Sequence, residues 1–201
     1  MAREIEIEFK NIVQKDEFER LKAVFHIEQQ AFHLQMNHYF DTPSFSVKEK
    51  GAALRIREKN GSLTLTLKQP HPDGLLETHQ KLAQQQAEQL QNSGKMPDGD
   101  VKQALHSLNV TGEQIQYLGK LATLRAETEY KGGTLVFDES TYLEKTDYEI
   151  EYETDSAEQG EKAFHDLMKD HGIPLRDTRN KIRRFFDEKQ KAEKTGDEHE
   201  N

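Results

Sequence analysis

Charged and apolar residues alternate strictly along several short segments of this chain, and this pattern constrains its fold more than any other. In residues 4–10 every second residue is charged, namely Glu4, Glu6, Glu8 and Lys10. Because successive side chains of a β-strand point to opposite sides, a period of two predicts strands with one charged and one apolar face. The pattern returns in residues 54–57, 63–68, 124–129, 134–138, 148–153 and 181–186.

Turn and helix signals separate these predicted strands. Asn60-Gly61 is typical of a two-residue hairpin turn, and Gly132-Gly133 is expected to form another. Apolar residues spaced three and four apart predict helices. These helices are expected at residues 16–25, 82–91, 98–109 and 111–118, and from Asp155 or Ser156 to just before Gly172.

The 201 residues suffice for one domain with its own core. No linker divides the chain, so we expect a single domain over residues 1–187. Residues 188–201 are rich in charge and almost lack apolar side chains. Such a segment cannot bury enough apolar surface to order itself, so this tail is expected to be disordered.

Composition excludes several classes of protein. The chain has no cysteine, which rules out disulfides, thiolate metal sites and a cysteine nucleophile. Its net charge of −9 argues against general binding of nucleic acid, because phosphate affinity comes from excess lysine and arginine. It has neither an apolar run long enough for a membrane helix nor an N-terminal export signal. We therefore expect a cytoplasmic protein without a membrane partner.

The charged strand faces favour a closed barrel over an open sheet exposed to water. Like charges two residues apart on a strand are about 6.6 Å from one another and repel. A barrel with its apolar surface outside, covered by the helices, and its charged surface inside accounts for both faces. Burying so many ions costs several kcal/mol each unless they are paired or solvated. Function rather than stability would then explain the charges.

The charged faces together suit phosphoryl transfer. Carboxylates are the hard oxygen ligands that Mg²⁺ and Mn²⁺ prefer, whereas arginine and lysine bind phosphate oxygens. The acidic set is Glu4, Glu6, Glu8, Asp138, Glu149, Glu151 and Glu153. The basic set is Arg55, Arg57, Lys68, Arg125, Lys181 and Arg183. Six fixed cations exceed the need of a monophosphate, so a triphosphate is the better match.

Several motifs then coincide with one known family. Glu6-Ile7-Glu8-Phe9-Lys10 matches the ExExK signature of the CYTH superfamily, also called triphosphate tunnel metalloenzymes. Further matching motifs are Tyr39-Phe40-Asp41-Thr42-Pro43, Leu54-Arg55-Ile56-Arg57-Glu58, the strand ending at Lys68, Asp138, Glu149-x-Glu151 and Arg179-Asn180-Lys181. The chain resembles this family over about residues 3–187 and is most similar to its YjbK-like members from bacilli.

The resemblance implies an α+β fold, a closed eight-stranded antiparallel β-barrel that forms a tunnel with a charged interior and helices packed outside. It implies Mg²⁺ or Mn²⁺ as cofactor, bound by Glu6, Glu8, Asp138, Glu149 and Glu151. Phosphates would be bound by Lys10, Arg55, Arg57, Lys68, Arg125 and Lys181. The residues expected to carry catalysis are Glu6, Glu8, Lys10 and Arg57.

Alternation adds three further expectations. Arg183 is expected to face inward with Lys181 and to bind phosphate. Glu4 and Glu153 extend the two glutamate rows, so either can replace a member of the metal-binding pair beside it. Glu77 is expected in the polar wall of the barrel.

The expected activity is divalent-metal-dependent hydrolysis of a small triphosphate compound, with inorganic triphosphate favoured over thiamine or nucleoside triphosphate. The absence of tryptophan and of a clear aromatic pair on a polar face disfavours a nucleobase site. One alternative is a class IV-type adenylate cyclase that makes cyclic AMP and pyrophosphate from ATP. Another is a non-catalytic module that binds polyphosphate or nucleotide. A homodimer is left open.

Overall fold

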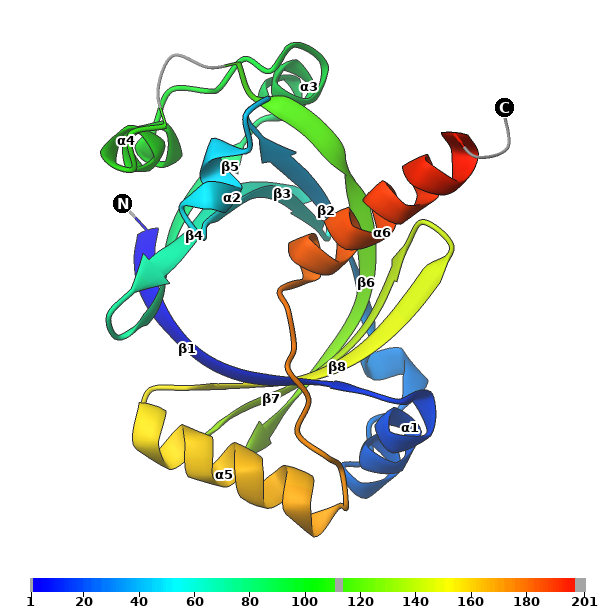
Figure 1. Ribbon diagram of the computed structural model, residues 1–201. Coiled ribbons are helices and arrows are strands. Elements are labelled where there is room, and N and C mark those ends of the chain that lie inside the picture. Colours follow the sequence, from blue (N-terminus) through cyan, green and yellow to red (C-terminus); the bar gives the residue numbers. More distant parts are fainter. Residues whose placement is uncertain (1, 111–113, 198–201) are drawn as a thin grey trace.

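Eight antiparallel strands close into one barrel in the computed structural model, which describes residues 2–110 and 114–197. The strands are β1 (Ala2–Val13), β2 (His33–Asp41), β3 (Ala53–Lys59), β4 (Ser62–His71), β5 (Gly74–Leu82), β6 (Gln116–Tyr130), β7 (Gly133–Tyr142) and β8 (Lys145–Thr154). Around the barrel their order is β1-β5-β4-β3-β2-β6-β7-β8. Figure 1 looks into this ring. The predicted closed eight-stranded antiparallel barrel is confirmed.

Tight turns fix the register between neighbouring strands. Asn60 and Gly61, which join β3 to β4, have φ angles of 51° and 74°. Lys131 and Gly132, which join β6 to β7, have φ angles of 44° and 82°. Two successive positive φ angles match the right-handed twist of a hairpin and favour asparagine and glycine. A register fixed in this way keeps the charged residues of each strand on one side.

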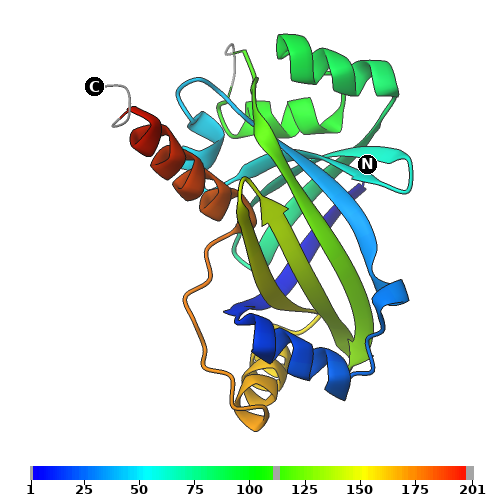
Figure 2. The same cartoon turned by 90° about the vertical axis from the view of Figure 1, so that its right-hand side faces the viewer.

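Helices cover the outer, apolar side of the barrel in two groups. Over β3 and β4 lie α3 (Gln84–Ser93) and α4 (Asp100–Ser107), where Leu90 and Leu105 pack with Leu54 and Leu65. On the opposite side, α1 (Lys15–Val24) and α5 (Ala157–Asp170) cover β7 and β8, where Phe18 and Phe164 pack with Phe137. Figures 1 and 2 show these two pairs at opposite ends of the view. Full burial of each large apolar side chain stabilises the fold by about 1.5–3 kcal/mol.

The remaining helical elements are η1 (Gln29–Ala31), α2 (Ser46–Glu49) and α6 (Lys181–Asp197). Helix α6 lies against the barrel through Phe185, which packs with Leu121 and Tyr142. None of the helices within residues 2–110 and 114–197 is both long and apolar enough to cross a membrane.

The strand predicted at residues 181–186 is wrong, because these residues begin α6. Helical spacing explains the difference, since it puts Ile182 and Phe185 together against the barrel. Residues 188–197, part of the tail expected to be disordered, continue the same helix. The predicted helix at 111–118 is also wrong where the structure describes it, since Gln116–Leu118 belong to β6; residues 111–113 lie outside the described residues.

Strands β2 and β5 are the two strands of the barrel that the alternating pattern did not predict. Their interior faces carry few charges, so alternation did not reveal them. In β2 the inward residues are Gln35, Asn37 and Tyr39, and in β5 the adjacent Leu75 and Leu76 interrupt the period of two.

Polar contacts hold residues 171–180 along the outside of the barrel. The Asn11 side chain donates a hydrogen bond to the Pro174 carbonyl (3.0 Å) and accepts one from the Arg176 amide (2.7 Å). The Arg176 guanidinium donates two hydrogen bonds to Glu17, both 2.8 Å long. These contacts position the segment that precedes α6, so that the helix begins at the opening of the barrel seen in Figure 1.

Candidate active site

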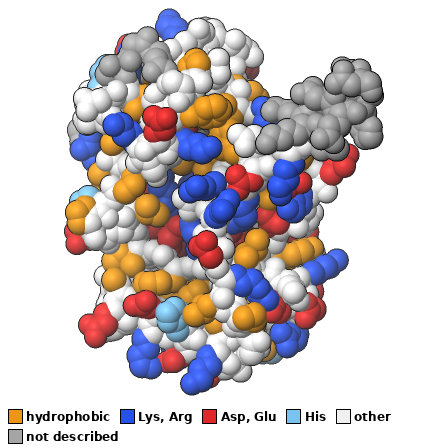
Figure 3. All heavy atoms as spheres, in the orientation of Figure 1, with side chains coloured by type: hydrophobic (Ala, Val, Ile, Leu, Met, Phe, Trp, Pro, Cys, Tyr) orange, Lys and Arg blue, Asp and Glu red, His pale blue; other side chains and the backbone are white. Residues whose placement is uncertain are grey.

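The interior of the barrel contains a cavity of about 270 Å³. Side chains from all eight strands and from the start of α6 line it. Every site residue predicted from the sequence lies on its wall except Arg183. On the face drawn in Figure 3, basic and acidic side chains gather near the centre, where the ring of Figure 1 opens.

Arg183 does not face this cavity, and the inward orientation expected for it is wrong. It lines a neighbouring cavity instead. The expectation assumed a strand, whereas in a helix the residue three positions after Lys181 shares its side. That residue is Arg184, whose Nη1 lies 2.6 Å from Glu149 and whose Nε lies 3.0 Å from Asp147. A helical interpretation of residues 181–186 would have identified Arg184.

The carboxylates on β1 and β8 form one acidic wall. The two strands are neighbours, and their register pairs Glu8 with Glu153 and Lys10 with Glu151. Glu149 and Glu151 are 1% and 5% exposed, so they lie deepest. The register thereby brings together two glutamate rows that are far apart in the sequence.

Asp138 on β7 is the centre of a network of buried ion pairs. It accepts two hydrogen bonds from the Arg125 guanidinium, of 2.7 and 2.6 Å, and Lys181 Nζ lies 2.8 Å from it. Arg125 also donates a 2.6 Å hydrogen bond to Glu151, and Lys181 donates one of 2.7 Å to Glu149. These cations offset the cost of burying the carboxylates.

Lys68 on β4 holds the other side of the acidic wall. Its ammonium lies 3.2 Å from both Glu8 and Glu77 and also contacts Glu6. Lys10 bonds to Glu8 at 2.8 Å and to the Asn180 side chain at 2.6 Å. The lysines expected to bind phosphate are therefore paired with carboxylates in this state.

Burial raises the pKa of three carboxylates in the acidic wall. Burial raises the pKa of Glu149 to about 7, although Lys181 opposes the shift. Burial likewise raises the pKa of Glu153 to about 7, against the effect of Arg125. Burial also raises the pKa of Glu6, with Lys68 acting in the opposite direction. A divalent cation such as Mg²⁺ prefers hard oxygen ligands and, bound beside these carboxylates, would favour their charged form.

Arg57 differs from the other cations of the cavity because it has no ion pair within the described part of the chain. Its Nε donates a 3.2 Å hydrogen bond to the Asn37 side chain. Burial, together with the charges of Arg55 and Arg125, lowers the pKa of Arg57 to about 10. The guanidinium therefore remains charged at neutral pH, in a position where an anion would stabilise it.

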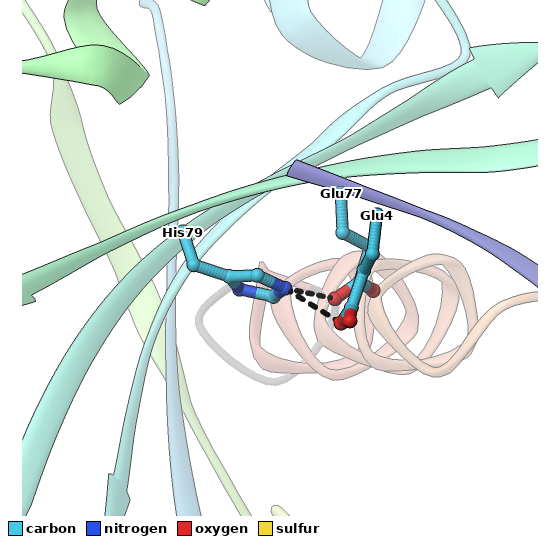
Figure 4. A group of neighbouring side chains, drawn as sticks. All are labelled: Glu4, Glu77 and His79. Atoms are coloured by element: carbon cyan, nitrogen blue, oxygen red, sulfur yellow. Dashed lines mark hydrogen bonds and ion pairs between the residues drawn. The ribbon is translucent and has the colours of Figure 1, made fainter. Parts of the chain in front are cut away.

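Glu77 on β5 lies in the polar wall as expected, and it faces a residue that the sequence analysis missed. His79 points toward Glu77 and Glu4, as Figure 4 shows. Ligand atoms of these three residues lie within 4.8 Å of one another. The unrecognised strand β5 is the reason His79 was missed.

A second cavity, of about 490 Å³, adjoins the first. The rings of Phe45 and Phe186 meet edge to face in its wall, and Lys48 Nζ lies 5.5 and 5.1 Å from their centroids. The two cavities share the wall residues Gly51, Ala53, Asn180 and Ile182. This aromatic pair was not predicted, because its two rings come from distant parts of the sequence.

The fold and the site together define a class of protein: a closed antiparallel barrel whose interior carries facing carboxylates and cations. The CYTH domain profile matches residues 4–186 of the chain. The chain therefore belongs to the CYTH domain family.

Named relatives support this assignment. "Putative triphosphatase YjbK" of Bacillus subtilis (strain 168) is 49% identical over 193 residues, which is 96% of this chain and all of that protein. A Bacillus halodurans crystal structure, described as a putative adenylate cyclase, is 47% identical with a TM-score of 0.89, covering 92% of this chain and 100% of that one. HpAC1 from Hippeastrum, described as a putative adenylyl cyclase that reveals a dominant triphosphatase activity, is 25% identical with a TM-score of 0.75, covering 91% of this chain and 96% of that one.

Proposed function

We propose that this protein hydrolyses a small triphosphate compound with the help of Mg²⁺ or Mn²⁺. The observation that carries the proposal is Arg57, a partly buried cation without an acidic partner among the described residues, which lines a cavity that other cations share. A phosphate oxygen would supply the charge that Arg57 lacks. Membership of the CYTH family and the triphosphatase activities ascribed to YjbK and HpAC1 support the same conclusion.

In this proposal the cations that line the barrel cavity exchange their carboxylate partners for phosphate oxygens when substrate binds. Without substrate, Lys68 and Lys181 neutralise the glutamates of the acidic wall. A triphosphate draws these lysines, with Arg55 and Arg125, toward its phosphate oxygens. The released carboxylates, Glu6 and Glu8 among them, would then be free to hold the divalent cation. Held there, a divalent cation would supply positive charge to offset the charge that develops on the leaving group.

In this proposal Asp138 does not bind the metal. Both of its oxygens already accept hydrogen bonds from Arg125, and Lys181 contacts it as well. It is 0% exposed. We therefore assign Asp138 to positioning Arg125 and Lys181, and the metal to the remaining glutamates of the sequence prediction.

Glu153 is the carboxylate best placed to take a proton from the attacking water. Its side chain is 33% exposed, and Arg125 at 3.5 Å is its sole ion-pair partner within the described residues. Its pKa of about 7 is close to the value that favours a general base at neutral pH. Glu149, which has a similar pKa, is held by Lys181 and Arg184 instead.

The second cavity extends the substrate class beyond inorganic triphosphate. Its aromatic wall, with Lys48 over the rings, can take a flat organic group while the phosphates remain in the barrel. Thiamine or nucleoside triphosphate would use both cavities, and inorganic triphosphate would use the barrel alone.

Product analysis tests this proposal. The pure protein is incubated with Mg²⁺ or Mn²⁺ and, separately, inorganic triphosphate, thiamine triphosphate and ATP, and the products are separated by ion exchange. Release of phosphate is the expected result, and the order of rates identifies the substrate. Formation of cyclic AMP and pyrophosphate from ATP would establish a cyclase instead. Binding without turnover of any of the three would establish a non-catalytic module.

A further inference from the structure

The cluster formed by Glu4, Glu77 and His79 lies at one end of the barrel cavity. Glu4 and Glu77 are direct partners on the paired strands β1 and β5, and His79 follows two residues later on the same side of β5. The Glu4 side chain is 68% exposed, whereas Glu77 is 6% exposed, so the cluster spans the opening. One imidazole and two carboxylates therefore converge where solvent enters.

The distances in this cluster suit a metal ion. His79 Nε2 lies 3.0 Å from Glu4 Oε1 and 3.3 Å from Glu77 Oε2. Nitrogen and oxygen ligands lie about 2.0–2.2 Å from Zn²⁺, so two ligands of one tetrahedral ion are about 3.3–3.5 Å apart. The two measured distances lie within a few tenths of an ångström of this value, and all three ligand atoms lie within 4.8 Å of one another.

A contact outside the cluster independently orients the imidazole. His79 Nδ1 lies 2.9 Å from the hydroxyl of Thr66, a buried residue on β4. Histidines that bind metals commonly hold their second ring nitrogen in such a hydrogen bond, which fixes the ring and its tautomer. With the proton on Nδ1, Nε2 presents its lone pair to the two carboxylates. The lone pair and the negative carboxylates repel one another, and a cation bound between them removes this repulsion.

We propose that Glu4, Glu77 and His79 bind a transition-metal dication, best matched by Zn²⁺, at the opening of the barrel. One nitrogen and two oxygen ligands form the kind of three-residue set that Zn²⁺ completes with water. The imidazole distinguishes this site from the all-carboxylate wall, because Mg²⁺ prefers oxygen ligands. The proposal does not depend on triphosphatase activity, although Glu77 also lies 3.2 Å from Lys68, a residue proposed to bind phosphate.

Competition with a chromophoric chelator tests the proposal directly. The full chain, stripped of metal and kept in millimolar Mg²⁺ to occupy the carboxylate wall, is titrated with Zn²⁺ without substrate. One Zn²⁺ is expected to bind per chain. His79→Gln and Glu4→Gln are each expected to weaken binding by at least about tenfold, and Thr66→Val by up to about tenfold.

His71→Gln is the matched control. His71 lies 3.5 Å from Asp73, and the described residues offer no third ligand beside this pair, so the loss of His71 should leave Zn²⁺ binding unchanged. Thermal unfolding is recorded for every variant, and Glu4→Gln keeps the test valid should His79→Gln fail to fold, because Glu4 is exposed.

Two results would overturn the proposal: no stoichiometric Zn²⁺ binding in the presence of Mg²⁺, or undiminished binding by both His79→Gln and Glu4→Gln. The first would mean that the cluster is only an ion pair of protonated His79. Hydrolysis of triphosphate by a protein that does not bind Zn²⁺ would overturn the proposed Zn²⁺ site and leave the proposed function standing. A chain that binds Zn²⁺ without turnover would overturn only the proposed function.

Discussion

Arg57 tests the proposed phosphate contacts at the scale of one residue. A charge-assisted hydrogen bond to a phosphate contributes about 1.5–3 kcal/mol, so Arg57→Ala should lower kcat/KM about 10- to 150-fold, mainly through KM. Arg183→Ala is the control, because Arg183 lies outside the barrel cavity. Steady-state kinetics with inorganic triphosphate measure both variants. Equal losses in the two would mean that helix α6 presents a different side to the substrate.

The glutamates of the acidic wall should make the metal-free protein less stable as the pH rises. The folded protein binds more protons than the unfolded chain between the ordinary glutamate pKa of 4.5 and the value of about 7 for Glu149 and Glu153. Its free energy of unfolding therefore decreases as the pH rises through that range. His38, whose pKa burial lowers, contributes the opposite slope.

Thermal unfolding in the presence of a chelator measures this effect. We expect a lower melting temperature at pH 7.5 than at pH 5.5, and a smaller difference in Glu153→Gln. Mg²⁺ should raise the melting temperature more at pH 7.5, where the carboxylates are charged. A Mg²⁺ effect independent of pH would place the cation away from these glutamates.

At the scale of elements, Arg184 joins helix α6 to strand β8. Its ion pairs with Asp147 and Glu149 are largely buried, with 11% of the Arg184 side chain exposed. Arg184→Ala leaves both carboxylates without this partner and should cost about 3–5 kcal/mol of stability. Urea unfolding measures the loss. The double variant with Glu149→Gln should recover part of it, whereas strictly additive losses would show that the two side chains do not interact.

Elements with strong alternation were predictable from the sequence, and those without it were not. Strands β1, β3, β4 and β8 carry charges on one face, so their period of two was clear. Strand β2 carries neutral polar residues inside, and β5 has two adjacent leucines, so both were missed. The segment that begins α6 contains apolar residues at spacings that suit either a strand or a helix, and only packing against Leu121 and Tyr142 decides between them.

At the scale of the whole molecule, the sequence predicted which residues would meet but not how they would be paired. Closure of the barrel follows from the charged faces, and it brings Glu8 beside Glu153. The pairing of Lys68 with three carboxylates depends on strand order and side-chain reach, and so does the lack of an ion pair for Arg57 among the described residues. The aromatic pair of the second cavity likewise needs the folded chain. The homodimer and the cytoplasmic location stay predictions.

The most direct test of the account is the dependence of phosphate release from inorganic triphosphate on Mg²⁺ concentration. The intact protein should release phosphate only with the cation and lose that activity in a chelator. Glu6→Gln should require more Mg²⁺ while remaining folded by circular dichroism, because it removes one oxygen ligand and some repulsion within the acidic wall. Phosphate release that needs no divalent cation, or that responds to Mg²⁺ identically in Glu6→Gln, would contradict the proposed metal-binding role of the acidic wall.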